Sequence, residues 1–555
     1  MLLDRYLPRI EFDSYEDFKK NYTVKTPEDF NFAYDIVDEW AKEDKEKKAL
    51  VWCDDNGGEV TLTFEEIRKL SNKAANYFRS IGLKKGSVAL LILRQRWEYW
   101  VIVTALMKLG VIFIPATLQL TKKDIAYRAN AAGVEMIICI DDDYVVEQVE
   151  AALPEMDKIK KIGLVNGNRD GWFNFHDEIK DFSDEFNRPD DDQKTYSKDI
   201  MQIYFTSGTT GMPKMVCHNY LHPLGHIVTA KYWHMVQDGK LHMTNSDSGW
   251  AKFGWGKIYG QWICGAVIFA YDAEKFTASN MLAMIEKYKI TTFCVPPTIY
   301  RFMLQEDVKK YDLSSVEHWT TAGEPLSAEV VNKWEELTGH KIASGFGQTE
   351  GTVLLADFQW FDPKPGALGK PSPIYNLQLR NAEGKECENG EEREICIADV
   401  DTNPPVGLFV GYYKNPEQTK EALGSGVYNL KDVAWRDNYG YYWFVGRHDD
   451  VIKCSGYRIG PFEVESALKL HPESAITAAP DPIRGQVVKA TIVLAKGYEP
   501  SPELIKELQN HVKKTTAPYK YPRIVEFVNE LPKTIGGKIK RAEIRSEDAK
   551  KHTEN

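Results

Sequence analysis

The chain has 555 residues, with 70 Lys and Arg against 81 Asp and Glu side chains and a formal net charge of -11. This length exceeds what one hydrophobic core normally supports, so we expect at least two domains. The acidic balance disfavours nucleic acid or an anionic membrane as the main partner and favours an enzyme acting on small molecules.

The first residues, MLLDRYLPRIEFDSYEDF, contain early acidic side chains and no apolar core typical of a signal peptide. The eight cysteines are scattered, with no C-x-x-C pair. No apolar run reaches the roughly 20 residues needed to span a bilayer. We therefore expect a cytoplasmic protein with no membrane partner.

Helix-like and strand-like segments alternate from about Phe64 to Pro115. Two amphipathic or apolar helical runs, 63–82 and 98–110, are each followed by a short apolar run, 88–93 and 111–116 respectively. The same rhythm continues to about residue 338. This alternation predicts an α/β fold in which a mostly parallel sheet has helices on its faces.

After about Pro371 the sequence pattern changes to short segments of alternating apolar and polar residues, separated by turns of Gly, Asn and Glu. This pattern predicts antiparallel β structure. From about Asp449 strand-like and helix-like segments follow one another for about a hundred residues, as in a small α+β module. We place the domain boundary there, with one domain over residues 1–448 and another over 449–555.

The stretch IYFTSGTTGMPKMV, from Ile203 to Val216, is rich in glycine and hydroxyl residues and ends near Lys214. Such a loop offers backbone N–H groups and a cation to an anion. It is not a Walker A loop, because no lysine directly follows the second glycine of the required spacing. Alone, it is equally compatible with a structural turn.

Four further segments favour a nucleotide site. TTAGEPL (320–326) offers backbone edges to a planar base, and LPKTIGGKIKR (531–541) presents a lysine on a Gly-Gly turn. In GFGQTEGT (345–352), Phe346 is suited to stack on adenine, Thr349 to donate to a phosphate and Glu350 to hold Mg²⁺. In the fourth segment, 428–465, Asp432 is suited to accept the ribose hydroxyls, with Arg447 close enough in sequence to reach the same nucleotide.

Together these motifs, over about Phe64 to Arg541, resemble the adenylate-forming superfamily of acyl-CoA synthetases, peptide-synthetase adenylation domains and luciferases. SDSGW (246–250), PPTIYR (296–301), TTAGEPL and GQTEG are most similar to the medium-chain acyl-CoA synthetase branch. The resemblance implies a large N-terminal domain of α/β subdomains plus a distorted β-barrel, followed by a small, mobile α+β domain.

The resemblance also implies the roles of individual residues. The β- and γ-phosphates of ATP are expected to lie in a loop formed by Thr206, Ser207, Gly208, Thr209, Thr210, Gly211 and Lys214. The rest of the nucleotide is expected to contact Gly323, Glu324, Pro325, Phe346, Thr349, Asp432 and Arg447, with Mg²⁺ on Glu350. The implied catalytic residues are Lys538, Thr349 and Glu350; the hinge is Asp449; and the CoA-related loop is Ser455, Gly456, Tyr457 and Arg458.

The position before Gln-Thr-Glu predicts the kind of acid. Acetyl-specific relatives have a tryptophan there that floors the acyl pocket, whereas this chain has Gly347. Glycine in place of this tryptophan would leave room in the acyl pocket, which predicts a medium-length, branched or aromatic acid. The expected pocket residues are Trp250, Gly254, Trp255, Cys294, Gly347 and Gly351. Lys252 and Lys257 leave open an acid with a polar group.

The expected function is an AMP-forming acyl-CoA synthetase that uses ATP, Mg²⁺, CoA and a carboxylic acid. A carboxylate attacking the α-phosphorus of ATP meets like charge, which Mg²⁺ and Lys538 would offset. Two alternatives stay open: an acyl-adenylate former with a different acceptor, and a catalytically idle ATP or acyl-AMP binding module. A homodimer is also left open.

The irregular spacing of His222, His226, His234 and His242 favours core positions over a metal site.

Overall fold

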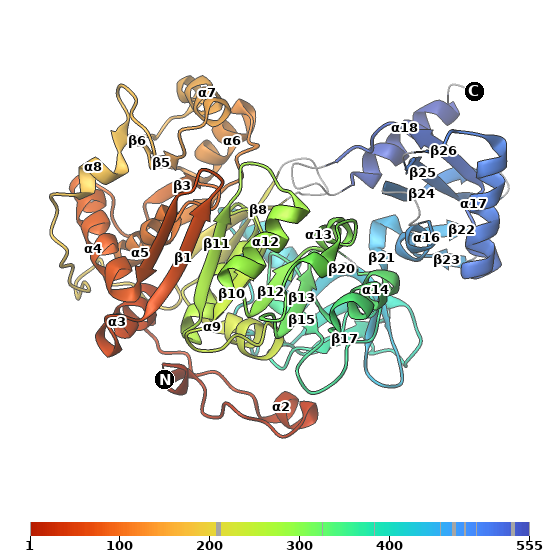
Figure 1. Ribbon diagram of the computed structural model, residues 1–555, viewed down its shortest axis with the longest axis horizontal. Helices are drawn as coiled ribbons and strands as arrows, with labels where there is room; N and C mark the ends of the chain where they lie inside the picture. Colours follow the sequence, from red (N-terminus) through yellow and green to blue (C-terminus); the bar gives the residue numbers. More distant parts are fainter. Residues whose placement is uncertain are drawn as a thin grey trace. The chain divides into compact units, whose positions relative to one another are not determined.

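The computed structural model describes residues 2–206, 213–324, 326–381, 383–454, 457–468, 473–481, 484–495, 497–533 and 539–553. The chain divides into two compact units, whose helices and strands are labelled in Figure 1. The first unit comprises Met1–Asn376 and Ala398–Tyr428, and the second comprises Leu377–Ile397 and Asn429–Asn555.

The first unit contains an eight-stranded sheet. Its strands in spatial order are β19 (Gly411–Tyr412), β9 (Lys214–Asn219), β8 (Ile200–Thr206), β4 (Ile112–Pro115), β3 (Val88–Ile92), β5 (Met136–Cys139), β6 (Lys161–Leu164) and β7 (Phe173–Asn174). Neighbours from β8 to β7 are parallel, whereas β8/β9 and β9/β19 are antiparallel. The parallel sheet predicted from the alternating runs is therefore confirmed.

One helix precedes the first parallel strand of this sheet in the chain, and further helices connect the parallel strands. They are α4 (Phe64–Ser80), α5 (Glu98–Leu109), α6 (Lys122–Ala132), α7 (Asp143–Ala152) and α8 (Phe175–Ile179). A capping box begins α4: the Thr63 hydroxyl accepts the Glu66 backbone N–H, and the Glu66 carboxylate accepts the Thr63 N–H. All residues of α5 are buried, because α4 and the sheet both pack against it.

A nine-stranded sheet forms the other half of the first unit. Its order is β16 (Lys370–Pro371), β15 (Val353–Ala356), β14 (Ile342–Gly347), β13 (His318–Ala322), β12 (Thr292–Val295), β10 (Leu241–Thr244), β11 (Val267–Asp272), β1 (Lys48–Asp54) and β2 (Glu59–Thr63). Neighbours from β14 to β1 are parallel. In Figure 1, β1 lies beside β11, so a segment before Phe64, where the family resemblance began, completes this sheet.

The remaining helices of the first unit are mostly short. They are α1 (Leu3–Tyr6), α2 (Tyr15–Asn21), α3 (Glu39–Glu43), α9 (His222–Ile227), α10 (Ala251–Lys257), α11 (Tyr259–Ile263), α12 (Ala278–Tyr288), α13 (Pro297–Met303), α14 (Ala328–Thr338) and α15 (Pro416–Leu423). Helix α10 approaches β10 closely: a Cβ on Gly256 would lie 2.0 Å from the Thr244 hydroxyl oxygen. Only glycine permits this approach.

The second unit contains two smaller sheets. The region after Pro371, predicted as antiparallel β structure, contributes a four-stranded sheet of β17 (Leu377–Arg380), β18 (Arg393–Ala398), β20 (Val427–Arg436) and β21 (Tyr442–Arg447), in which β17/β18 and β20/β21 are antiparallel. A five-stranded sheet follows, with β23 (Tyr457–Ile459), β22 (Ile452–Cys454), β25 (Gly485–Val493), β24 (Glu473–Asp481) and, beside β25, β26 (Ile524–Val528). Its helices are α16 (Pro461–Ala467), α17 (Pro502–Thr515) and α18 (Arg541–Thr553).

The second unit starts earlier in the chain than the predicted boundary at residue 449, because it includes the four-stranded sheet. The rotation of residues 449–555 about a hinge at Asp449 stays a prediction. Among the residues that the structure describes, no helix combines the length and the apolar character needed to cross a membrane.

Candidate active site

Most predicted nucleotide and acid residues of the first unit lie at one edge of the nine-stranded sheet. Strands β10, β12, β13 and β14 are parallel, so their carboxyl ends meet at the same edge. Ligands of open α/β sheets bind beyond such carboxyl ends. The edge carries SDSGW after β10, Cys294 in β12, Gly323 after β13 and the Gln-Thr-Glu turn after β14.

The two ends of the predicted phosphate loop are paired strand residues. Thr206 ends β8 and faces Lys214, which begins β9. The Lys214 Nζ lies 5.0 Å from the ring centroid of Tyr412, and the Tyr412 hydroxyl donates to the Glu350 Oε1 at 3.4 Å. Burial and the Glu350 charge raise the pKa of Tyr412, which keeps the phenol a donor. The structure thus brings the base of the phosphate loop and the predicted Mg²⁺ ligand to one tyrosine, Lys214 over its ring and Glu350 at its hydroxyl.

The turn that carries Thr349 and Glu350 is held by groups from distant parts of the chain. The imidazole Nε2 of His218 lies 2.7 Å from the Thr349 carbonyl oxygen, and the Phe409 N–H donates to the Glu350 carbonyl at 2.7 Å. The Tyr428 hydroxyl donates to the Gln348 Oε1 at 3.2 Å. The backbone of this turn is therefore fixed on several sides, while Thr349 and Glu350 remain half-buried.

The residues predicted to contact adenine are neighbours across two strands. Ala322 pairs with Gly345, so Gly323 and Phe346, the next residues of β13 and β14, are adjacent at the sheet edge. Gly323 has φ +103, a conformation that favours glycine. Glu324 is exposed and accepts a hydrogen bond from the Thr298 hydroxyl at 2.7 Å. This arrangement leaves a backbone turn beside an aromatic ring, as stacking and edge recognition of a base require.

The predicted ribose residues form a cross-strand pair in the second unit. Asp432 in β20 is opposite Arg447 in β21, and one guanidinium nitrogen lies 3.2 and 3.3 Å from the two carboxylate oxygens. The Asp432 side chain is 5% exposed, whereas that of Arg447 is 45% exposed. The structure therefore brings these two residues together. Asp449 follows in a short, exposed helical turn, His448–Asp450.

The space above Gly347 is occupied. A Cβ at this position would lie 2.3 Å from the indole of Trp255 and 2.5 Å from the Thr352 carbonyl oxygen. The expectation that Gly347 leaves open space therefore needs a correction: glycine at this position admits the indole of Trp255 from α10. The other two predicted glycines are less crowded: a Cβ on Gly254 would lie 3.0 Å from the Tyr204 hydroxyl, and one on Gly351 would lie 3.3 Å from the Tyr375 hydroxyl. Trp255 and Cys294 are buried, and Trp250 is 36% exposed.

Lys252 and Lys257 bond to protein atoms. The half-buried Lys252 ammonium donates to the Ala322 carbonyl at 2.8 Å, at the end of β13. Lys257 is 1% exposed and donates to the Gln95 side-chain oxygen. Burial lowers the pKa of Lys252 and lowers that of Lys257 to about 7.

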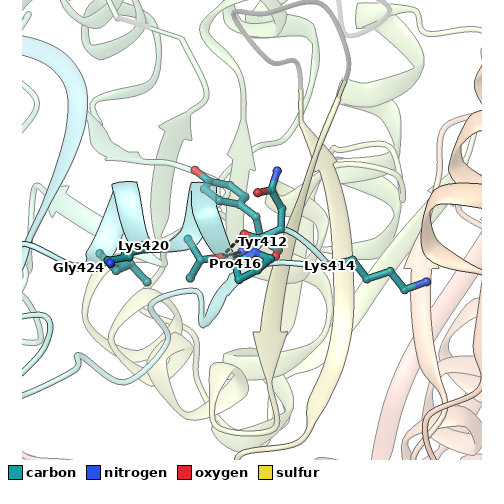
Figure 2. A pocket seen from close by; sticks show the side chains of 8 residues that line it. Tyr412, Lys414, Pro416, Lys420 and Gly424 are labelled. Atoms are coloured by element: carbon teal, nitrogen blue, oxygen red, sulfur yellow. Dashed lines mark hydrogen bonds between the residues drawn. The ribbon is translucent and has the colours of Figure 1, made fainter.

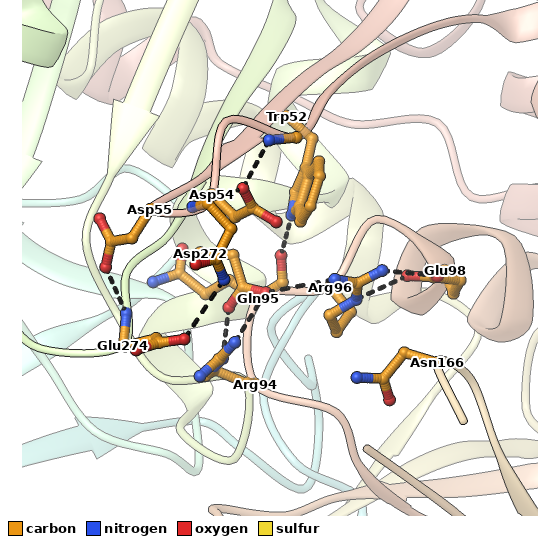
Figure 3. A network of polar contacts seen from close by, with 12 residues as sticks. Trp52, Asp54, Asp55, Arg94, Gln95, Arg96, Glu98, Asn166, Asp272 and Glu274 are labelled. Atoms are coloured by element: carbon orange, nitrogen blue, oxygen red, sulfur yellow. Dashed lines mark hydrogen bonds and ion pairs between the residues drawn. The ribbon is translucent and has the colours of Figure 1, made fainter. Parts of the chain in front are cut away.

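Gln95 belongs to a charged loop that follows β3 (Figure 3). Arg94, at φ +53, binds the fully buried Asp272 at 2.5 Å, and Arg96 binds Glu98 at 3.0 Å. The Trp52 indole donates to the Gln95 carbonyl at 2.8 Å. These contacts fix the loop, so Lys257 faces a rigid part of the protein and its partner is a neutral amide.

A hollow of about 600 Å³ lies beside Tyr412, between this ring and helix α15. Figure 2 shows Lys414 and Lys420 extending away from each other. Lys414 donates to the Ala132 carbonyl at 3.0 Å, at the end of α6. The two cations do not converge on one point, so the hollow does not form an anion cradle.

Several predicted residues lie outside the described residues. They are Ser207, Gly208, Thr209, Thr210, Gly211, Pro325, Ser455, Gly456 and Lys538. Tyr457 and Arg458 begin strand β23.

Comparison with known proteins identifies the family. Residues 37–413 match the AMP-binding enzyme family, and residues 463–538 match the AMP-binding enzyme C-terminal domain. The chain belongs to the AMP-binding enzyme family.

Relatives of this AMP-binding enzyme are acyl-CoA synthetases. It is 42% identical to the mitochondrial acyl-coenzyme A synthetase ACSM3 of Pongo abelii, over 97% of this chain and 93% of the relative. It is 41% identical to the mitochondrial ACSM4 of Rattus norvegicus, over 94% of this chain and 91% of the relative. The predicted superfamily, fold class and ligase class are confirmed.

Solved structures agree with this assignment. The anthranilate CoA ligase AuaEII in complex with anthranoyl-AMP aligns with a TM-score of 0.86 at 27% identity, over 95% of this chain and 99% of that chain. The benzoate CoA ligase of Burkholderia xenovorans LB400 aligns with a TM-score of 0.80 at 25% identity, over 93% of this chain and all of that chain.

The prediction of a cytoplasmic location is wrong, because the relatives ACSM3, ACSM4 and ACSM5 are mitochondrial synthetases. Scattered cysteines indicate a reducing environment but do not distinguish the compartments that provide one. Location is set by a targeting segment, and composition and fold carry no information about it.

The sequence did not reveal the residues that support the Gln-Thr-Glu turn of this AMP-binding enzyme. His218 is 131 positions from Thr349, and Tyr412 is 62 positions from Glu350. Such contacts arise from the strand order and leave no spacing pattern. The one signal available in the sequence was a histidine, His218, in the apolar run directly after the predicted phosphate loop.

Proposed function

We propose that this AMP-forming acyl-CoA synthetase activates a medium-chain, branched or aromatic carboxylic acid and transfers the acyl group to CoA. The observation that carries the proposal is a pair of contacts to Tyr412 beside the carboxyl edge of the nine-stranded sheet: the Lys214 ammonium lies over its ring, and its hydroxyl donates to Glu350. These contacts link the predicted triphosphate loop to the predicted metal ligand. An ATP-dependent acid ligase needs both groups in one place.

ATP and CoA enter as substrates of this enzyme class. In the proposed site, Thr206 and Lys214 flank the β- and γ-phosphates, Gly323 and Phe346 enclose adenine, and Thr349 donates to the α-phosphate. Asp432 accepts the ribose hydroxyls and Arg447 supports the nucleotide. The roles of Ser207–Gly211 and Pro325 in this proposal come from the family resemblance.

The residues of the turn fit Mg²⁺. Glu350 supplies one half-buried carboxylate, and the described residues hold no cluster of three or more His, Cys, Asp or Glu side chains suited to an all-protein metal site. Mg²⁺ is commonly held by one or two carboxylates, waters and substrate phosphates, so a single carboxylate is an appropriate ligand set. When bound, the ion supplies positive charge that offsets the charge on the transferred phosphate.

In the first half-reaction, the acid carboxylate attacks the α-phosphorus and pyrophosphate leaves, giving an acyl-AMP mixed anhydride. The protein forms no covalent bond. Its task is to place two anions in line and to offset their repulsion. We assign the cation that acts at the reacting phosphate to Lys538, from the family motif.

In the second half-reaction, the CoA sulfur attacks the acyl carbonyl and AMP leaves. The two half-reactions need different groups at one centre, which a rotation of residues 449–555 about Asp449 would provide. The loop Ser455, Gly456, Tyr457 and Arg458 would then serve thioester formation. A homodimer is also proposed, and sedimentation at micromolar concentration tests it.

The acid is proposed to end against the indole of Trp255. This ring covers Gly347, whereas Trp250 and Cys294 occupy the neighbouring strand ends. Lys252 donates to a backbone carbonyl and Lys257 to Gln95, so both ammonium groups have protein partners. This favours an apolar acid. Relatives named as anthranilate and benzoate CoA ligases support an aromatic acid within the range.

The test is pyrophosphate release from MgATP with acids from acetate to decanoate, with 2-methylbutyrate and with benzoate, each with and without CoA. We expect acid-dependent release that turns over only with CoA, with an optimum above acetate. Turnover without CoA would favour a different acceptor. Absence of release with every acid would overturn the proposal and favour an idle binding module.

A further inference from the structure

Three buried histidines form a line beneath the turn of Thr349 and Glu350. His218 is in β9, and His222 and His226 are on successive turns of α9; their exposed fractions are 0%, 2% and 0%. The rings of His218 and His222 have centroids 3.7 Å apart. The Nε2 atoms of His222 and His226 are 3.1 Å apart. The three rings are therefore in direct contact from the turn into the core.

The partners of these rings determine where each proton resides. The His222 Nδ1 lies 3.0 Å from the Gly407 carbonyl, which only accepts, so Nδ1 carries the proton and the His222 Nε2 is an acceptor. His226 must then donate from its Nε2 to His222. The His226 Nδ1 consequently accepts from the Thr229 hydroxyl at 3.2 Å.

His218 follows the same logic. Its Nε2 lies 2.7 Å from the Thr349 carbonyl, so Nε2–H is the donor, and its Nδ1 has no hydrogen-bond partner among the described residues. A second proton on His222 would place its Nε2–H against the Nε2–H of His226, so the observed contact requires His222 to be neutral. Burial lowers the pKa of all three, that of His218 to about 4, which keeps the rings neutral.

The line of histidines holds two carbonyls, one in the turn and one in the segment that binds the turn. His218 holds the Thr349 carbonyl, whereas His222 holds the Gly407 carbonyl two residues before Phe409, whose N–H donates to the Glu350 carbonyl at 2.7 Å. The orientation of the Thr349 hydroxyl and the Glu350 carboxylate depends on the peptide plane between them. His218 fixes that plane.

We propose that His218 is a positioning residue for acyl adenylation, holding the Thr349–Glu350 peptide so that both side chains meet the phosphates of MgATP. This inference rests on the proposed function of the turn. His222 contributes by packing against the His218 ring at an interplanar angle of 32° and by fixing the second carbonyl. The neutral rings add no charge beneath a site that must balance the charges of ATP.

His318 offers a matched control in the same unit. Its Nε2 lies 2.8 Å from the Trp233 carbonyl, and burial lowers its pKa to about 4. It therefore makes the same type of bond in a similar environment, but to a carbonyl outside the Gln-Thr-Glu turn. His218→Phe and His318→Phe both leave one carbonyl without its donor, whereas His218→Gln retains an N–H donor near the Nε2 position.

The experiment measures acid-dependent pyrophosphate–ATP exchange, thioester formation from presynthesised acyl-AMP, ATP affinity by calorimetry in Mg²⁺, and melting temperature. For His218→Phe we expect the exchange kcat to fall by about tenfold to a hundredfold, since small misplacements of reacting groups have effects of this size. ATP affinity should weaken in parallel, and thioester formation from acyl-AMP should change far less. His218→Gln should recover most of the loss, and His318→Phe should lower the melting temperature without lowering exchange.

Equal losses in His218→Phe and His318→Phe, or in both half-reactions, would reduce His218 to a structural role and overturn the proposal. Imidazole ¹⁵N NMR of the wild-type enzyme applies even where a variant does not fold. We expect the Nε2–H tautomer at His218 and a shift of its resonance, but not that of His318, on addition of MgATP. An unshifted His218 resonance on saturation with MgATP would also overturn it. ATP binding without exchange for any acid would instead contradict the proposed function.

Discussion

The two units of this acyl-CoA synthetase present their predicted site residues in different ways. In the first unit, Thr206 ends β8, Phe346 is in β14, and the turn with Glu350 follows β14, where His218 and Phe409 hold its backbone. In the second unit, Asp432 and Arg447 are a cross-strand pair on a four-stranded sheet. The predicted residues of the first unit are therefore held at the edges of two large sheets by buried groups, whereas those of the second lie on smaller sheets and on the turns between them.

The strongest test of this contrast is Lys538→Ala in the second unit. We expect acyl adenylation to fall by at least about a thousandfold, because one cation offsets charge that develops on the transferred phosphate. Conversion of presynthesised acyl-AMP to thioester should continue, since no phosphate is transferred in that step. Both rates are measured on the same preparation. Equal loss of both half-reactions would break the assignment of this lysine to the first step alone.

Glu350→Gln tests the proposed site of the first unit. Removing the charge should lower pyrophosphate exchange by about a hundredfold, the size seen when one electrostatic contact to a transition state is lost. The Mg²⁺ concentration for half-maximal rate should rise. Glu317→Gln, an exposed carboxylate bonded to Gln237, is the control and should leave both values unchanged. A normal Mg²⁺ requirement in Glu350→Gln would argue against this ligand.

Asp432→Asn probes the corresponding pair of the second unit. Hydrogen bonds to a charged group contribute about 1.5–3 kcal/mol, so we expect the KM for ATP to rise about tenfold or more. The ribose is held alike before and during the reaction, so kcat should change little. Steady-state kinetics at saturating acid separate the two parameters. A fall in kcat at constant KM would mean that Asp432 acts on the chemistry.

Trp255→Leu tests the proposal that the acid ends against the indole above Gly347. We expect the ratio of kcat/KM for decanoate over butyrate to rise by about tenfold or more, since one methylene in an apolar pocket is worth about 10- to 200-fold. Trp262→Leu is the matched control: Trp262 is fully buried in the same unit, and its indole donates to the Ala49 carbonyl. Both variants should lose stability, and only the first should change the preference. A shared shift would assign the effect to loosened packing.

Acid should destabilise the first unit selectively. The described histidines whose pKa is lowered all belong to it; the pKa is about 4 for His218 and His318 and about 3 for His242. Their unfolded forms take up protons near pH 6.5, so their contribution is complete above that pH and is lost as the pH falls toward 4, by up to about 1.4 kcal/mol per group and pH unit. Calorimetry at pH 7.5, 6 and 5 should show the first unit's transition moving down more than the second's. Parallel shifts would contradict this.

The sequence predicted the fold class and the residues of the turns, because strand alternation and glycine-rich turns are local signals. The apolar runs 88–93 and 111–116 form parallel strands, as the predicted parallel sheet requires, and Gly323 lies beside Phe346. What sequence patterns did not predict depends on tertiary packing. Strand β1 completes the nine-stranded sheet from before Phe64, and Trp255 fills the space above Gly347 from another element. No local pattern encodes which distant ring enters the space that a glycine leaves.

The indole above Gly347 comes from a different element than the turn that it covers. Trp255 is on α10, whereas the Gln-Thr-Glu turn follows β14. In the proposed function the acid and the nucleotide are therefore handled by separate elements. A substitution at position 255 would then change the acid preference while the residues proposed to contact ATP stay untouched, so acid specificity can diverge without a change in the adenylation chemistry.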